Sequence, residues 1–294
     1  MEDADAGRVP AAGAAEQMVA VTPQTGPAGD LVAQMDLDAV QESGLIRHKT
    51  TYSKKDMDTQ TFISKYRQAF GETAELPLLF YYDNEPVADT DKINGCLFKG
   101  MDAARKGEGL SLSAETIGCG GGKLYTAFAP MPEHVPGFVS QKERYKASPE
   151  DVITCIERLD IRPAAKKYLN FIRIDRAKSF DPMEGILFFA TPDMLSGLAT
   201  WAFFDNNADD AVSCIFGSGC SSVVAQAVRE NRIGGRRTFI GLLDSSVRPY
   251  VESNVLSFVI PASRFKEMCR TMDRCCLFHT NAWNKVKERI THNS

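Results

Sequence analysis

The sequence has no tract of basic residues and no long apolar run. Its 34 Lys and Arg are outnumbered by 38 Asp and Glu, for a formal charge of −4. Nucleic-acid binding needs clustered Lys and Arg that displace counterions, so we predict no nucleic-acid partner. No stretch comes near the ~18–20 apolar residues that cross a bilayer, so we predict no membrane partner. The N-terminus has neither the basic nor the apolar region of a secretion signal, and we expect a cytoplasmic protein.

Eight cysteines are present, but in none of the common motif spacings. There is no CxxC and no Cys/His finger pattern; the cysteines are Cys96, Cys119, Cys155, Cys214, Cys220, Cys269, Cys275 and Cys276. A cytoplasm keeps thiols reduced, and a chain of 294 residues needs no disulfide to hold its core together. We therefore expect free thiols, most of them packed as small apolar side chains.

Composition divides the chain near Met57. Residues 1 to about 34 are rich in Ala, Gly, Pro and Thr and contain no aromatic residue, so they cannot bury enough apolar surface to offset the entropy of ordering. We predict that residues 1–56 are a disordered or weakly structured N-terminal extension. Residues 57–294 are predicted to form a single globular domain, with halves at 57–175 and 176–294 as an alternative division.

The apolar pattern after Met57 predicts short strands interspersed with helices. Strands are expected at 76–83, 110–116, 168–174, 185–191, 211–216, 237–244 and 255–261, and helices at 59–70, 93–109, 149–159, 191–205, from 221, from 262 and at 281–290. Helix caps are expected at Asp58 or Thr59, Ser148, Thr191, and Ser263 or Ala262.

Several of these strands follow one another without a helix between them. This favours an α/β or α+β fold, with a mixed sheet or sheets flanked by helices, over a doubly wound nucleotide-binding fold. The order of elements from LLFYY to GCGGG also echoes the order from ILFFA to GSGC. The echo indicates pseudo-duplicated halves whose two Gly-Cys turns face one crevice, or a chance recurrence.

The most specific feature of the sequence is the turn formed by Gly118, Cys119, Gly120, Gly121 and Gly122. Consecutive glycines leave backbone N–H groups free to converge on an anion, and a helix that follows adds positive potential. The same field favours a reactive thiolate at Cys119. The alternative is a tight turn around a buried thiol. The spacing matches neither a phosphate-binding GxxxxGK[ST] loop nor a dinucleotide fingerprint.

A second turn, GSGCSS, places Gly219, Cys220 and Ser221 where a helix begins. Acyl transfer by a cysteine needs a base. The four histidines, His48, His134, His279 and His292, have no orienting context, which argues against a Cys-His hydrolase. We predict that Cys119 is the most reactive thiol, followed by Cys220. Cys96 should react slowly because its predicted helical face is apolar.

Two polar segments follow the second turn. Asp244 and Arg248 end a predicted strand, where they either contact a ligand or close the turn as an ion pair. The basic cluster at 231–238 is interpreted as a solvated loop, with a phosphate grip as the alternative.

Five sequence blocks together resemble a known family, the domain of unknown function 169. They are the segment NGCLFKGMDAARKGEGLSLSAET around Cys96, the GCGGG turn, ILFFATPDMLSGL, the SGC turn, and GLLDSSVR with SFVIPASRFKEM. The resemblance covers about Met57 to Met272. It implies a soluble protein of no established activity in which Cys96, Cys119 and Cys220 come together. The family often carries a Gly-Cys-x-Gly-Cys-Arg block near its end, where this chain has Gly241 to Arg248 without a cysteine. This departure argues against a four-thiolate iron–sulfur cluster: either Asp244 or Ser245 replaces the lost thiol, or the site holds a zinc, an organic ligand or nothing.

The sequence therefore predicts a crevice lined by Cys96, Cys119 and Cys220. Three thiolates with one oxygen ligand suit zinc or an iron–sulfur cluster, which gives a metal-binding or redox function. The alternatives are a metal-free module for a small anionic ligand and an enzyme with a cysteine nucleophile of low pKa. The expected partner is a small molecule or a metal, and the sequence names neither a substrate nor an oligomeric state.

Overall fold

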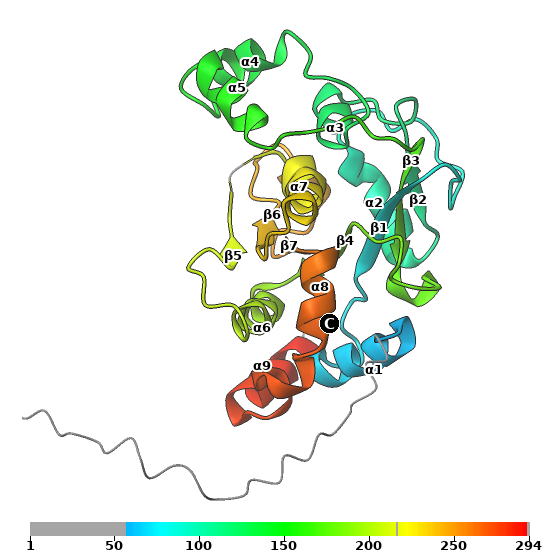
Figure 1. The fold of residues 1–294 in the computed structure, drawn as a ribbon, viewed down its shortest axis with the longest axis vertical. Helices are drawn as coiled ribbons and strands as arrows, with labels where there is room; N and C mark the ends of the chain where they lie inside the picture. Colours follow the sequence, from blue (N-terminus) through cyan, green and yellow to red (C-terminus); the bar gives the residue numbers. More distant parts are fainter. Residues whose placement is uncertain (1–56, 216, 293–294) are drawn as a thin grey trace, which may run out of the picture. The chain divides into compact units, whose positions relative to one another are not determined.

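The computed structural model describes residues 57–215 and 217–292 (Figure 1). Predictions that concern residues 1–56 or Phe216 lie outside these residues. The described part of the chain contains one mixed sheet of seven strands with helices against both faces, which confirms the expected fold class. No helix in this part is both long enough and apolar enough to cross a bilayer.

The sheet has the strand order β2-β3-β1-β4-β7-β6-β5. Neighbouring strands are antiparallel, except that β5 and β6 are parallel. The strands are β1 (Leu78–Asp83), β2 (Leu110–Leu112), β3 (Tyr168–Arg173), β4 (Gly185–Ala190), β5 (Val212–Ser213), β6 (Thr238–Gly241) and β7 (Leu256–Pro261). The α-helices are α1 (Thr59–Phe70), α2 (Met101–Lys106), α3 (Gly120–Tyr125), α4 (Val135–Gly137), α5 (Pro149–Glu157), α6 (Pro192–Phe203), α7 (Gln226–Ile233), α8 (Ala262–Cys269) and α9 (Asn281–His292).

Strand β4 lies at the centre of the sheet, and all six of its residues are buried. Side chains alternate between the faces of a strand, so its apolar run supplies both faces. Ile186 and Phe188 belong to the cluster that packs under α1, α6, α8 and α9. Leu187 and Phe189 belong to a second cluster, with α2 and α7 on the opposite face. The fold is thus two helical layers around one sheet.

Three predicted helix caps are confirmed. Asp58 accepts a hydrogen bond from the Thr61 amide at 2.7 Å, and Ser148 accepts one from the Asp151 amide at 3.1 Å. Thr191 accepts from the amide three residues later, at 3.5 Å. The cap predicted at Ser263 or Ala262 is wrong, because α8 follows Pro261 directly and has no side-chain cap.

Several predicted elements are shorter than expected. The helix expected at 93–109 starts only at Leu97, as a short 3₁₀ segment η1 (Leu97–Gly100) that continues into α2. Strand β2 ends at Leu112 because the Ser113 amide donates to the Thr116 hydroxyl at 2.8 Å, which turns the chain. Strand β5 covers only two residues. The sheet does not show the proposed duplication, since only its second half contains a parallel pair.

A small third cluster lies apart from the two main layers. Leu124 of α3 packs with Val152 and Ile156 of α5. Figure 1 shows α4 and α5 standing beyond α3 and α7, connected by the π-helical segment η2 (Phe138–Lys142). We call residues 135–159 the α4–α5 segment. It forms one wall of the cavity described below.

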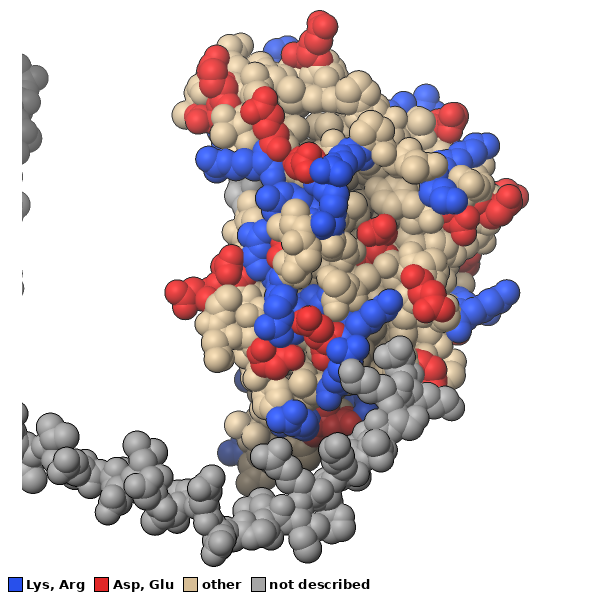
Figure 2. All heavy atoms as spheres, viewed as in Figure 1, with Lys and Arg blue, Asp and Glu red and all other residues tan. Residues whose placement is uncertain are grey.

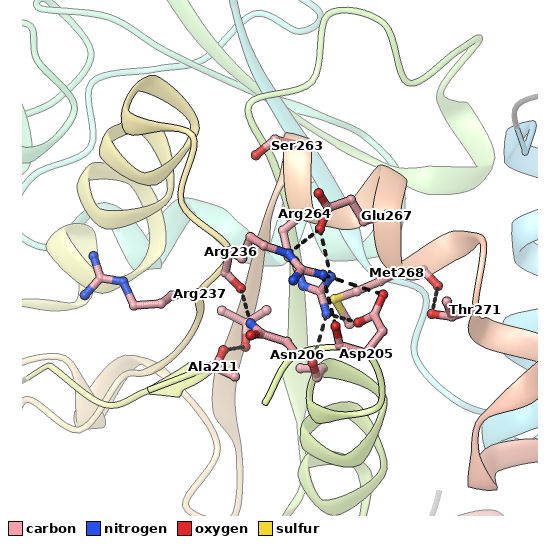
Figure 3. A network of polar contacts seen from close by, with 12 residues as sticks. Asp205, Asn206, Ala211, Arg236, Arg237, Ser263, Arg264, Glu267, Met268 and Thr271 are labelled. Carbon is pink, nitrogen blue, oxygen red and sulfur yellow. Dashed lines mark hydrogen bonds and ion pairs between the residues drawn. The ribbon is translucent and has the colours of Figure 1, made fainter. Parts of the chain in front are cut away.

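An ion network ties α6 to α8 (Figure 3). The Arg264 side chain is fully buried, donates to Glu267 and to the Ala202 carbonyl at 2.9 Å each, and pairs with Asp205. Arg236 reaches the same two acidic residues from a more exposed position. Because the Arg264 charge is desolvated, it depends on both carboxylates.

We predict that Arg264→Met lowers the free energy of unfolding by about 3–5 kcal/mol, since it leaves two partly buried carboxylates without their buried partner. The matched change Arg236→Met should cost about 0–1 kcal/mol, because exposed pairs contribute little. Urea unfolding at pH 7 measures both. Equal losses would contradict the argument, since the two arginines share their partners and differ in burial.

Candidate functional site

A cavity of about 420 Å³ lies between α3, the α4–α5 segment and two loops. One side is polar and includes the start of α3, Ser218 and Asp244. The other side is mainly apolar and comes from the α4–α5 segment, with Val135, Phe138, Val139, Val152 and Ile156. A polar floor under an apolar wall is typical of small-molecule sites.

Cys119 lies at this polar side, at the N-cap of α3. Its backbone is extended, and its Sγ accepts a hydrogen bond from the Gly122 amide at 3.4 Å. The sequence predicted that an amide of the glycine run would face this sulfur. The glycines, however, form the first turn of a six-residue helix and not an open nest.

The glycines of the two turns divide into packed and open positions. A Cβ on Gly118 would lie 2.5 Å from the Ile93 carbonyl oxygen, and one on Gly122 would lie 2.9 Å from Ile117. Gly219 is equally tight, at 2.8 Å from the Phe98 ring. These three glycines allow close packing and are absent from the cavity lining, so their predicted ligand contacts are not found there.

Gly120 and Gly121 are different, because both line the cavity and both have room for a side chain. A Cβ on Gly120 would lie 3.4 Å from Pro132, and one on Gly121 would lie 3.9 Å from the Cys119 Sγ. Glycine in a helix is less stable than alanine, so packing does not account for these two. The missing side chain of Gly121 keeps the space beside the sulfur open, and that of Gly120 leaves room next to Pro132.

Cys220 precedes the π-helical segment η4 (Ser221–Ala225) and is only 7% exposed. Burial raises the pKa of its thiol well above the usual value. The first turn is capped by Ser218, whose hydroxyl accepts from the Ser221 amide at 3.3 Å. The prediction that Cys220 is the second most reactive thiol is therefore wrong, because desolvation disfavours the thiolate.

Cys96 lies just before η1, not inside a helix as predicted. It is partly buried against the cluster under α2, and burial is the main reason that its pKa is raised. The expectation that Cys96 reacts slowly agrees with this direction. All eight cysteines are free. Cys214 is exposed, contrary to the expectation of a packed thiol, because β5 ends one residue before it.

The three predicted cysteines lie within electrostatic reach of one another. Burial dominates the raised pKa of both Cys96 and Cys220, and the charges of Cys119 and Asp244 add to it in each case. Four separate segments thus contribute to one region. Even so, no group of three or more His, Cys, Asp or Glu side chains in residues 57–215 and 217–292 could hold a metal ion as placed. The metal centre stays a prediction.

Asp244 and Arg248 do not pair with each other, and only Asp244 lines the cavity. The buried Asp244 carboxylate lines the cavity and accepts from the amide and the hydroxyl of Ser246, at 2.8 and 2.7 Å. Arg248 instead donates to carbonyls around its own loop, including that of Val255 at 2.6 Å. Its guanidinium closes the loop and is absent from the cavity lining.

Tyr125 and His134 are among the cavity residues that sequence reasoning missed. Burial raises the pKa of Tyr125 to about 12. His134 was set aside because its sequence context is a loop, yet it lines the same cavity as Cys119. Tyr125 ends α3 close to Cys119 in the sequence, whereas His134 reaches the cavity because it lies directly before the α4–α5 segment.

The basic cluster at 231–238 is engaged in ion pairs. Arg232 pairs with Asp160, Arg236 with Glu267 and Arg237 with Glu230, at 2.7–2.8 Å. Figure 2 shows Lys and Arg side chains gathered over α7 and α8 with acidic ones among them. The predicted loop is shorter than expected, because residues 231–233 end α7 and Thr238 begins β6, and Arg236 and Arg237 between them are held in ion pairs.

A comparison with known protein families matches residues 73–271 to the family described as "Uncharacterised ArCR", the domain of unknown function 169. The chain belongs to this family. The domain of unknown function 169 match contains all three predicted cysteines and Asp244, whereas α1 and α9 lie outside it. No curated protein and no solved structure matches the chain significantly.

The division of the glycines predicts opposite effects of alanine on stability. Gly219→Ala should lower the free energy of unfolding by about 1–3 kcal/mol, because its Cβ would overlap the Phe98 ring. Gly121→Ala should leave stability unchanged or raise it by up to about 1 kcal/mol. Thermal unfolding of the two variants checks this. A loss at Gly121 comparable to that at Gly219 would show that the α3 turn is only a tight corner.

Proposed function

We propose that the chain binds a small molecule in the cavity beside Cys119 and that the Cys119 thiol contacts it. The observation that carries this proposal is the pair Gly120 and Gly121. Both line the cavity and have room for a Cβ, and the missing Cβ of Gly121 leaves space beside the sulfur. The apolar wall of the α4–α5 segment would cover the body of the ligand.

Five of the seven other cysteines support this assignment by contrast. Burial is the main cause of a raised pKa at Cys96, Cys220, Cys269, Cys275 and Cys276. Such thiols pack as apolar groups and react slowly. Cys119 combines a cavity position with a hydrogen bond to its sulfur. Its location therefore favours contact with a ligand.

We expect iodoacetamide at pH 7 to label Cys119 at least ~10-fold faster than Cys220 or Cys275, because each unit of raised pKa cuts the thiolate fraction about tenfold. Mass spectrometry of the digested protein ranks the sites. Labelling of Cys275 or Cys276 before Cys119 in the folded protein would refute the proposal.

The control for cavity access is Gly121→Leu, which fills the space beside the sulfur. Labelling of Cys119 should slow markedly in this variant, whereas Cys214 should keep its rate because it is exposed and lies outside the cavity lining. An unchanged Cys119 rate would show that the reagent does not enter through the cavity.

A second candidate function is metal binding, because Cys119 and Asp244 both act electrostatically on Cys96 and on Cys220. Three thiols and a carboxylate have the donor chemistry of a zinc or iron–sulfur site. In their present positions they do not form a group that could hold an ion among the described residues. We therefore derive no chemical step through a metal.

Metal analysis and visible absorption after anaerobic purification test this candidate. Metal binding predicts about one zinc per chain without colour, or cluster absorbance, lost in both Cys96→Ser and Cys220→Ser but kept in Cys155→Ser. Cys155 is the matched control because it is also a cavity cysteine but not one of the predicted ligands. Protein that retains no metal and shows no absorbance would exclude the candidate.

A further inference from the structure

A second cavity, of about 510 Å³, adjoins the first. It lies between α5, α7 and β6, and it shares Tyr125, Cys155, Ile156 and Gly217 with the cavity beside Cys119. Ser221, which the sequence predicted as a ligand contact, lines this second cavity. The two cavities can therefore hold the two ends of one ligand.

The described lining of the second cavity contains three arginines and no acidic residue. Arg237 is neutralised by Glu230 at 2.7 Å. Arg158 and Arg229 make no side-chain hydrogen bond or ion pair with any other described residue, and the Arg229 Nε is buried. Positive charge without a counter-charge in a concave site favours an anion.

Gln226 gives a second indication of a ligand, independent of the arginines. Its side chain is only 3% exposed and lines the same cavity. Its Nε2 donates to the Ile215 carbonyl at 3.4 Å, whereas its Oε1 has no partner among the described residues. A buried acceptor without a donor is costly, so a ligand with an N–H or O–H group would complete it.

The groups that line the second cavity indicate the chemical class of its ligand. Gln226 and Arg229 are three residues apart on α7 and therefore lie on one face of the helix. Ile156, Leu159 and Phe239 add apolar surface around them. The site thus presents guanidinium groups, one hydrogen-bond acceptor and an apolar surface.

We propose that the second cavity binds a small organic anion, a carboxylate or a phosphate ester. Its anionic group contacts Arg229 and Arg158, and its N–H or O–H group donates to the Gln226 Oε1. This names the ligand class for the site proposed above and rests on that proposal, because the adjoining cavities would hold the same molecule.

The test is calorimetric titration of the full chain with 3-hydroxybenzoate, which combines a carboxylate, an apolar ring and an O–H donor; phenyl phosphate supplies the phosphate-ester arm. Saturable binding of either anion is expected, with neutral 3-hydroxybenzamide at least ~10-fold weaker. Benzoate, which lacks the donor, should bind about 2–10-fold more weakly than 3-hydroxybenzoate. Failure of both anions to bind would overturn the proposal.

Substitutions of arginines from both sides of the second cavity test whether the anion binds there. Arg229→Met should weaken binding at least ~10-fold. Arg232→Met is the matched control on the same helix, because Arg232 pairs with Asp160 and lies outside the cavity lining, and binding should stay within about twofold. Arg158→Met changes an exposed residue, so it reports on binding even where a buried variant unfolds. Equal affinities for Arg158→Met, Arg229→Met and Arg232→Met would overturn the proposal.

Gln226→Leu and Cys119→Ser complete the set. Gln226→Leu should abolish the preference for 3-hydroxybenzoate over benzoate, and a retained preference would refute the role of Oε1. Cys119→Ser should keep anion binding, because the arginines are unaltered. Slow iodoacetamide labelling of Cys119 with intact anion binding would refute only the ligand contact proposed for Cys119. Rapid labelling of Cys119 without anion binding would refute only the anion site in the second cavity.

Discussion

The burial of β4 on both faces is the constraint on which the rest of the structure depends. All six of its residues pair with β7 and three of them, Gly185 to Leu187, also pair with β1, and no position faces solvent. Gly185 permits close packing of β1 on β4, since a Cβ there would lie 2.7 Å from the Phe80 ring. A sheet with such a centre is stable only if helices cover both faces, and the two apolar clusters are the result.

The candidate site lies at the margin of one of these layers. The segments before η1 and η4 place Cys96 and Cys220 against the cluster under α2 and α7. The packing that positions these thiols also removes water from them, which raises the pKa of both. Cys119 comes from α3, outside that cluster, and meets the cavity. Cys119 therefore lines the cavity because it lies outside the apolar cluster, whereas Cys96 and Cys220 are packed against that cluster.

Local sequence signals predicted the fold well where the deciding interaction is itself local. Asp58, Ser148 and Thr191 cap helices through amides three residues away, and the apolar run of β4 is continuous. Predictions failed where a longer-range contact intervenes. The helix expected to contain Cys96 begins after it, and Cys214 is exposed because β5 pairs over only two residues.

The sequence by itself determined most of the strands and longer helices, three of the helix caps and the presence of two Gly-Cys turns, because each depends on neighbouring residues. Only the tertiary structure decided which glycines are packed and which are open, since this depends on partners such as Ile93 and Phe98. It likewise placed His134 beside the Cys119 cavity and left the Gln226 Oε1 without a partner among the described residues. Burial and hydrogen-bond satisfaction belong to the whole packed chain, and no local pattern encodes them.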